Sequence, residues 1–200
     1  DKAITPKTKW LILNQPCNPT GACYTREQLK ALTDVLMKHP HVWILTDDMY
    51  EHLVYGGFKF CTVAEVEPNL YERTLTMNGV SKAYAMTGWR AGWVCAPKPI
   101  LDGILKVHQY GIMSAPTTAQ DAALVAIRHG DADVERMLAE YDRRRRLLVD
   151  GFNGMGLRTF EPRGAFYTFP QISSTGLDSE TFAQRLLDEE RVAVVPGNAF

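Results

Sequence analysis

The sequence predicts an α/β fold: a large domain with a mostly parallel sheet and helices on both faces, followed by part of a smaller α+β domain. Two observations carry this prediction. In the first half of the chain, short apolar runs alternate with longer stretches of helical period, which is typical of parallel strands joined by helices. In the second half, a long helical pattern leads into a segment where strand-like and helix-like patterns alternate.

Four short apolar runs in the first half are predicted to be buried strands, because turn-forming residues bound them. They cover residues 10–13, 42–45, 74–77 and 91–95. Between the first two, a capping box over residues 25–28 begins a helix whose apolar stripe includes Leu29, Leu32 and Leu36. This helix must end before Pro40, because proline is not tolerated inside a helix.

The second half is predicted to begin with an alanine-rich helix over residues 117–129, which Gly130 and Asp131 break. A long helix follows and ends near Gly154. After it we expect a strand, a helix and a second strand, over residues 164–169, 179–190 and 192–195. The chain then divides into a large domain, a long interdomain helix and the start of a smaller domain, at residues 1–130, 131–155 and 156–200.

Composition excludes several kinds of partner. The chain is 46% hydrophobic and 22% charged with a net charge of −1, so neither nucleic acid nor a membrane surface is expected as a partner. No apolar run approaches the ~20 residues of a spanning helix. The cysteines are scattered and no metal-ligand spacing is present, so we expect no metal and a cytoplasmic location where thiols stay reduced. The arginine run at 143–146 is interpreted as a solvated helix face.

Polar and ionisable residues follow three of the predicted strands. Asn18 comes after the first, within Asn-Pro-Thr-Gly, and Asp47 comes after the second, within Asp-Asp-Met-Tyr. Lys82 follows the third, directly after Ser81, and Arg90 closes the same segment. Ligands of such sheets collect at the carboxyl ends of the strands. The sequence therefore predicts a binding site that contains these residues.

These motifs, in this order, resemble those of fold type I, class I/II aminotransferases of the aspartate and aromatic aminotransferase kind. The resemblance covers almost the whole chain and implies the fold type I PLP-transferase fold, with pyridoxal 5′-phosphate (PLP) as cofactor. It implies an enzyme that moves an amino group between an amino acid and a 2-oxo acid, by a ping-pong cycle through pyridoxamine phosphate. It also implies a homodimer with shared active sites. Because family members are longer, we expect an N-terminal part and a C-terminal tail outside this sequence.

The resemblance also implies a role for each residue. Lys82 binds the PLP aldehyde covalently and is the catalytic proton carrier. Asp47 pairs with the ring nitrogen; it is preferred to Asp48 because the family's carboxylate stands three residues before a tyrosine. That tyrosine, Tyr50, and Asn18 donate to the 3′ oxygen of the ring, and Asn18 also binds the substrate carboxylate.

The phosphate of PLP is assigned to two residues by the same resemblance. Arg90 can hold it with the bidentate guanidinium fork, and the Ser81 hydroxyl can add a hydrogen bond. Gly79 is a departure, because some relatives have a serine at this position, three residues before the lysine. Phosphate binding therefore depends on Ser81, Arg90 and groups outside this sequence.

Two alternatives share these motifs. One is a PLP-dependent carbon–sulfur lyase or synthase of the same fold, and the other is a non-catalytic regulator domain that senses PLP. The ending Ala-Met-Thr-Gly-Trp-Arg, residues 85–90, favours the aminotransferases. Residues 91–127 contain no arginine, whereas aspartate-specific members place an arginine for the distal carboxylate there. We therefore expect an enzyme that accepts neutral or aromatic donors alongside a dicarboxylate, with 2-oxoglutarate as acceptor.

Overall fold

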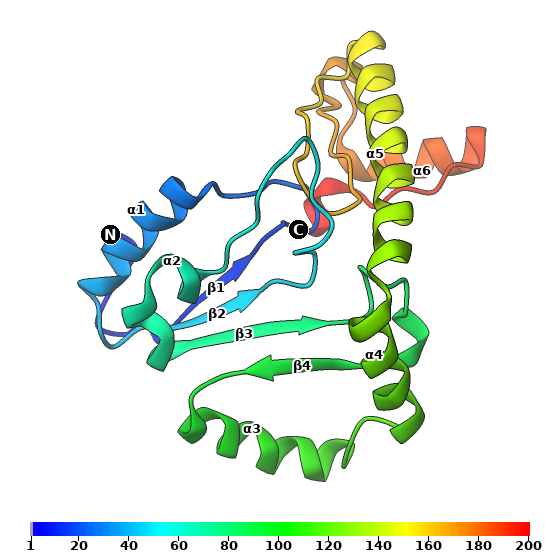
Figure 1. The fold of residues 1–200 in the computed structure, drawn as a ribbon. Coiled ribbons are helices and arrows are strands. Elements are labelled where there is room, and N and C mark those ends of the chain that lie inside the picture. Colours follow the sequence, from blue (N-terminus) through cyan, green and yellow to red (C-terminus); the bar gives the residue numbers. More distant parts are fainter. Residues whose placement is uncertain (1) are drawn as a thin grey trace.

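The computed structural model describes residues 2–200 (Figure 1). Within them a single sheet has the strand order β1-β2-β3-β4. The strands are β1 (Trp10–Asn14), β2 (Trp43–Asp47), β3 (Thr74–Gly79) and β4 (Gly92–Cys95). The first three are parallel, and β4 is antiparallel to β3. The prediction of an α/β fold with a mostly parallel sheet is confirmed.

The strand register aligns the polar ends of the strands. Asn14 of β1 lies opposite Asp47 of β2, which lies opposite Met77 of β3. At the β3–β4 pair, Gly79 lies opposite Gly92. A Cβ on Gly79 would stand 2.9 Å from the Ala91 carbonyl oxygen, so in this chain the two backbones approach more closely than a side chain allows. A serine here, as in some relatives, would require a local shift of the backbone.

Helix α1 (Arg26–Met37) covers one face of the sheet together with α2 (Val63–Val66) and the short η1 (Pro68–Arg73). The predicted capping box is present: the Thr25 hydroxyl accepts from the Gln28 amide at 3.3 Å, and the Gln28 side chain accepts from the Thr25 amide at 2.9 Å. The core below is apolar and consists of Leu13, Leu29, Leu36, Val42, Ile44, Cys61, Val63, Val66 and Leu70. On the alternate side of β1, Ile12 is 70% exposed.

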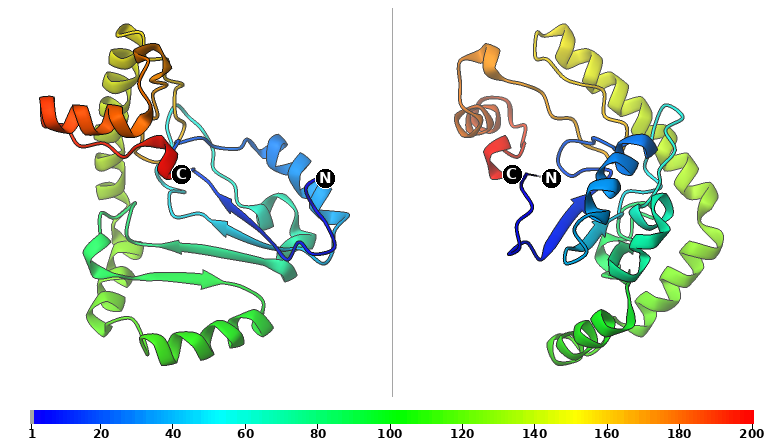
Figure 2. Two further views of the ribbon diagram at one scale, coloured as in Figure 1. Left: turned by 180° about the vertical axis from the view of Figure 1, so that it is seen from behind. Right: turned by 90° about the vertical axis from the view of Figure 1, so that its left-hand side faces the viewer.

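Three helices follow the sheet: α3 (Lys98–Gly111), α4 (Thr117–His129) and α5 (Asp131–Gly154), with the turn η2 (Thr87–Trp89) before β4. The predicted boundaries of α4 and α5 are confirmed. Gly130 lies between them, and a side chain does not fit there because a Cβ would lie 2.5 Å from the Ala126 carbonyl oxygen. Figure 2 shows α5 as one long helix that runs from α4, beside the sheet, to the segment carrying α6. The sequence did not predict α3, whose first turn contains Pro99 and whose middle contains Gly103.

The last part of the chain contains η3 (Ser173–Thr175), α6 (Ser179–Glu190) and η4 (Gly197–Ala199). The predicted helix 179–190 is confirmed, and Asp178 caps it by accepting from the Thr181 amide at 2.9 Å. The predicted strands 164–169 and 192–195 are wrong: only an isolated bridge between Val54 and Gly164 forms. A strand needs a partner for its backbone groups, and among the described residues no strand runs beside either segment. No helix in the described part of the chain has the length and apolar character needed to cross a membrane.

After α5 the chain returns to the sheet as an irregular segment, residues 158–167, which we call the strap. The amides of Arg163 and Gly164 both donate to the Gly21 carbonyl at 3.1 Å, and the Ala165 amide donates to the Leu53 carbonyl at 2.9 Å. The Tyr55 amide donates to the Arg163 carbonyl at 3.0 Å. The strap is therefore bound by backbone hydrogen bonds to the loops that follow β1 and β2.

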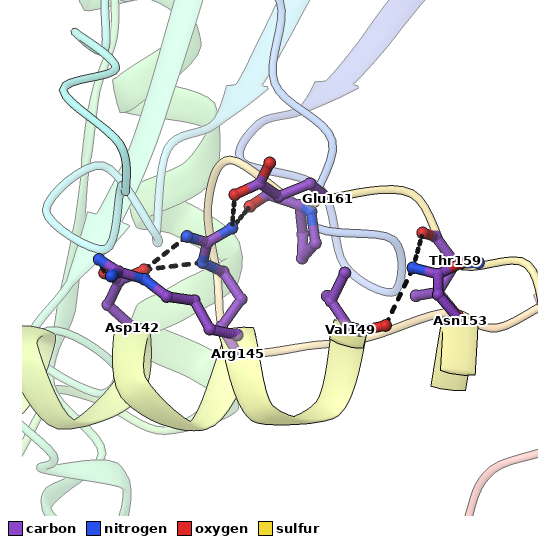
Figure 3. A network of polar contacts seen from close by, with 8 residues as sticks. Asp142, Arg145, Val149, Asn153, Thr159 and Glu161 are labelled. Atoms are coloured by element: carbon purple, nitrogen blue, oxygen red, sulfur yellow. Dashed lines mark hydrogen bonds and ion pairs between the residues drawn. The ribbon is translucent and has the colours of Figure 1, made fainter. Parts of the chain in front are cut away.

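Polar contacts of Arg145 and Asn153 hold the strap to α5 (Figure 3). Arg145, 8% exposed, pairs with Asp142 one turn before it at 2.6 Å and with Glu161 of the strap at 2.6 Å. Its guanidinium also donates to the Pro162 carbonyl at 3.3 Å. Further along α5, the Asn153 side chain donates to the carbonyls of Val149 and Thr159, each at 2.9 Å. Together these contacts set the distance between α5 and the strap.

Candidate active site

Asn14, the last residue of β1, joins two of the predicted motifs. Its side-chain amide donates to the Asp47 carbonyl at 3.3 Å, and its side-chain oxygen accepts from the Asn18 amide at 2.6 Å. The Gln15 amide also donates to the Asp47 carbonyl, at 3.2 Å. The loop that carries Asn18 is thus tied to the end of β2. The sequence analysis missed Asn14, although a polar residue that closes an apolar strand was a usable signal.

Gly21, the glycine of Asn-Pro-Thr-Gly, is required by the strap as well as by its own turn. Its φ is +72°, a conformation that side chains rarely adopt. A Cβ there would lie 2.5 Å from the Pro162 Cβ and 2.7 Å from the Gly164 carbonyl oxygen. Only glycine therefore allows the loop of Asn18 and the strap to pack together.

The two adjacent aspartates lie in opposite environments. Asp48 is 1% exposed and accepts a hydrogen bond from the Thr46 hydroxyl, and burial raises the pKa of its carboxyl to about 6. Asp47 is only half-buried, and its carboxylate accepts from the Met49 amide at 3.3 Å. Asp48 thus belongs to the core, whereas Asp47 stays accessible at the carboxyl end of β2.

Lys82 lies between two aromatic rings. Its Nζ is 6.0 Å from the ring centroid of Tyr50 and 5.9 Å from that of Phe166 in the strap. The hydroxyl oxygens of Tyr50 and Tyr167 are 2.5 Å apart. Burial and this hydrogen bond raise the pKa of Tyr50 well above its usual range, so its hydroxyl stays protonated. The structure therefore brings Tyr50 next to Lys82, as the motif order predicts.

Phe166 and Tyr167 were missed as site residues, because the sequence analysis assigned their segment to a strand. Their only sequence signal was a pair of adjacent aromatic residues after a glycine, which a buried strand also shows. Their place beside Lys82 depends on the strap, which crosses to the sheet after the long helix α5.

Ser81 and Arg90 lie on the turns that connect β3 to β4. Ser81 is half-buried directly beside Lys82 in the sequence. Arg90 is exposed, adopts the left-handed conformation with φ of +56°, and donates to the Thr87 carbonyl at 2.9 Å. The described contacts of Arg90 are thus within its own turn. The structure does not bring its guanidinium against Lys82.

A second group of polar residues supports the end of β3. The Asn78 side chain donates to Glu51 at 2.6 Å and accepts from the Gly79 amide at 2.7 Å. His52 lies 3.3 Å from the same Glu51 carboxylate; the pairing raises the pKa of His52 and lowers that of Glu51. These contacts connect the loop after Tyr50 to the strand that leads into Lys82.

Comparison with known proteins agrees with this geometry. The family model described as aminotransferase class I and II matches residues 1–200. The chain belongs to this family. It is 50% identical over 211 residues to the "Probable aspartate/prephenate aminotransferase" of Rhizobium leguminosarum bv. phaseoli, a match that covers 100% of this chain and 53% of the relative.

Solved structures of aminotransferases show the same fold. The aspartate aminotransferase from Rhizobium meliloti superposes with a TM-score of 0.93 at 43% identity, covering 99% of this chain and 52% of that one. The aromatic aminotransferase from Pyrococcus horikoshii OT3 gives a TM-score of 0.94 at 44% identity, covering 99% and 53%. This chain therefore spans about half the length of the relatives it matches.

The residues at this site fit PLP by the chemistry of their groups. A lysine amine flanked by aromatic rings suits an aldehyde, and an accessible carboxylate at the end of β2 suits a protonated ring nitrogen. A hydroxyl that keeps its proton suits donation to the 3′ oxygen. Asn18, Ser81 and Arg90 lie on loops at the same end of the sheet, after β1, after β3 and before β4.

Proposed function

We propose that this chain is part of a PLP-dependent aminotransferase, which moves an amino group between an amino acid and a 2-oxo acid. The observation that carries the proposal is Lys82, held between Tyr50 and Phe166 in a chain that belongs to the class I and II aminotransferases. When bound, PLP supplies the electron sink for the reaction. The proposal includes a homodimeric, cytoplasmic enzyme.

Each residue then has a defined task. Lys82 Nζ would hold the cofactor through its aldehyde and would move the proton at the substrate Cα; it lies beside the rings of Tyr50 and Phe166. Asp47 holds the proton on the ring nitrogen. Tyr50 and Asn18 donate to the 3′ oxygen, and Asn18 also orients the substrate carboxylate. Arg90 and Ser81 bind the phosphate.

The absence of an arginine from residues 91–127 bears on the substrate. A bidentate guanidinium–carboxylate pair in a closed site discriminates strongly for a dicarboxylate, and without it a neutral side chain need not be rejected. We infer that the enzyme accepts aromatic and neutral donors as well as aspartate. The relatives of the chain include aminotransferases named for aspartate and prephenate and for aromatic substrates, which is compatible with this range.

A single-turnover experiment tests the reaction and the range together. The complete protein, loaded with PLP, is mixed separately with aspartate, alanine and phenylalanine. We expect all three to convert the cofactor to pyridoxamine phosphate with release of the matching 2-oxo acid. Ammonia release without pyridoxamine phosphate would indicate a lyase instead, and strict selectivity for aspartate would overturn the substrate range alone.

A further inference from the structure

The hydroxyl pair of Tyr50 and Tyr167 has a consequence for how the proposed cofactor is held. The two oxygens are 2.5 Å apart, although the residues stand 117 positions apart in the sequence. Their rings contact each other edge to face at 5.7 Å, and Tyr50 is 3% exposed. The Lys82 amine lies 6.0 Å from the centroid of the Tyr50 ring, and the charge of the Asp47 carboxylate contributes to the raised pKa of Tyr50.

Tyr167 is held in this position by the strap. The preceding Ala165 adopts φ of +57°, its amide donates to the Leu53 carbonyl, and its carbonyl accepts from the buried Tyr55 hydroxyl. Phe166, between Ala165 and Tyr167, stacks on Tyr141 of α5 with centroids 5.4 Å apart. Since both neighbours of Tyr167 on its N-terminal side are fixed, the hydroxyl is presented to Tyr50 by a rigid support.

The number of hydroxyl protons at the tyrosine pair limits which of the two hydroxyls can donate to the other. Each phenol has one O–H donor, and oxygens 2.5 Å apart need a proton between them. If Tyr50 supplies that proton, it has none for another acceptor. If Tyr167 supplies it, the proton of Tyr50 is free. A phenol whose oxygen accepts a hydrogen bond is also the stronger donor, because hydrogen bonds in a chain polarise one another.

We propose that Tyr167 is a positioning residue for the cofactor: it donates to the Tyr50 oxygen and thereby directs the Tyr50 proton to the 3′ oxygen of PLP. This inference rests on the proposed function and adds a residue from the strap to the site. If Tyr167 has this role, the hydrogen bond to the 3′ oxygen of PLP depends on how the strap packs against the sheet. The ligand class is a phenolate oxygen of a bound pyridine ring.

The test removes one oxygen and keeps the ring. In the complete protein reconstituted with PLP, Tyr167→Phe should leave the cofactor attached but raise the pH midpoint of its absorbance change, because a weaker Tyr50 donor stabilises the ring phenolate less. We expect a rise of roughly half a pH unit. Tyr50→Phe should raise the midpoint further. Tyr141→Phe, which changes a neighbouring tyrosine outside the pair, is the matched control and should leave the midpoint unchanged.

The double variant separates positioning from general support of the fold. If Tyr167 acts through Tyr50, Tyr167→Phe should add nothing in the Tyr50→Phe background. An unchanged midpoint in Tyr167→Phe, or the same shift with and without Tyr50, would overturn the inference. Failure of the wild-type protein to attach PLP would instead overturn the proposed function.

Discussion

At the scale of single residues, burial separates two carboxyl groups that are adjacent in the sequence. Asp48 is buried in the core and accepts a hydrogen bond from Thr46, whereas Asp47 is the last residue of β2, at the carboxyl end of that strand. The sequence analysis chose Asp47 only through the family's spacing to Tyr50. The structure supplies an independent argument for that choice, because the Asp48 carboxyl lies in the core and accepts a hydrogen bond from the Thr46 hydroxyl, whereas Asp47 is only half-buried.

The two aspartates should therefore respond differently to substitution. The pKa of Asp48 is raised from 3.8 to about 6, so the folded state holds this proton more tightly than the unfolded state. Stability from this group is present below pH 4 and is lost as the pH rises through 6. Asp48→Asn should increase the free energy of unfolding by up to about 3 kcal/mol at pH 7.5 and by little at pH 4, in urea titrations of the complete protein.

Asp47→Asn is the matched control for that change. It should slow transamination by at least about a hundredfold, because an amide cannot hold the ring proton electrostatically. Asp48→Asn should retain most of the activity. If the activity were lost with Asp48→Asn and kept with Asp47→Asn, the assignment of the ring-nitrogen partner would be reversed.

At the scale of elements, the strap connects α5 to the site. It contacts α5 through Arg145, the loop of Asn18 through Gly21, and the loop after β2 through Leu53. It also carries the two aromatic residues beside Lys82 and Tyr50. A substitution of Arg145 on α5 should therefore also change the position of the strap residues that lie beside Lys82 and Tyr50.

Two arginines of the run at 143–146 allow a matched comparison. Arg145→Ala should destabilise the protein by about 3 kcal/mol, because Asp142 and the strap lose a buried charged partner. Arg143→Ala removes an exposed pair with Glu140 and should have little measurable effect on stability. Thermal unfolding of both variants decides; equal losses would show that the ion pairs of Arg145 stabilise the fold no more than the exposed pair of Arg143 does.

Local signals predicted the elements that depend on local chemistry. The capping box of Thr25 and the break at Gly130 located α1, α4 and α5, because caps and glycine act within a few residues. The prediction of strands at 164–169 and 192–195 was wrong because a strand needs a neighbouring strand to pair with, and the periodicity of a sequence does not reveal such a partner. The aromatic contacts of the strap could not be predicted either, because they also depend on segments that are distant in the sequence.

At the scale of the whole molecule, segments that are distant in the sequence meet at the carboxyl ends of the parallel strands. The position of Asn18, Asp47 and Lys82 at this end of the sheet was predictable, because each lies at or after the end of a recognisable strand. Asn14 and Tyr167 were not, because their roles depend on contacts made after folding. The division of the chain at residues 130 and 155 stays a prediction.

The account depends most directly on Lys82 as the covalent attachment point of PLP. The complete protein is incubated with PLP, reduced with borohydride, digested and mapped by mass spectrometry. We expect the pyridoxyl group on the peptide that contains Lys82, its loss in Lys82→Arg, and its retention in Lys98→Arg, which changes an exposed lysine paired with Asp102. A pyridoxyl group on any other lysine, or none on Lys82, would contradict the account.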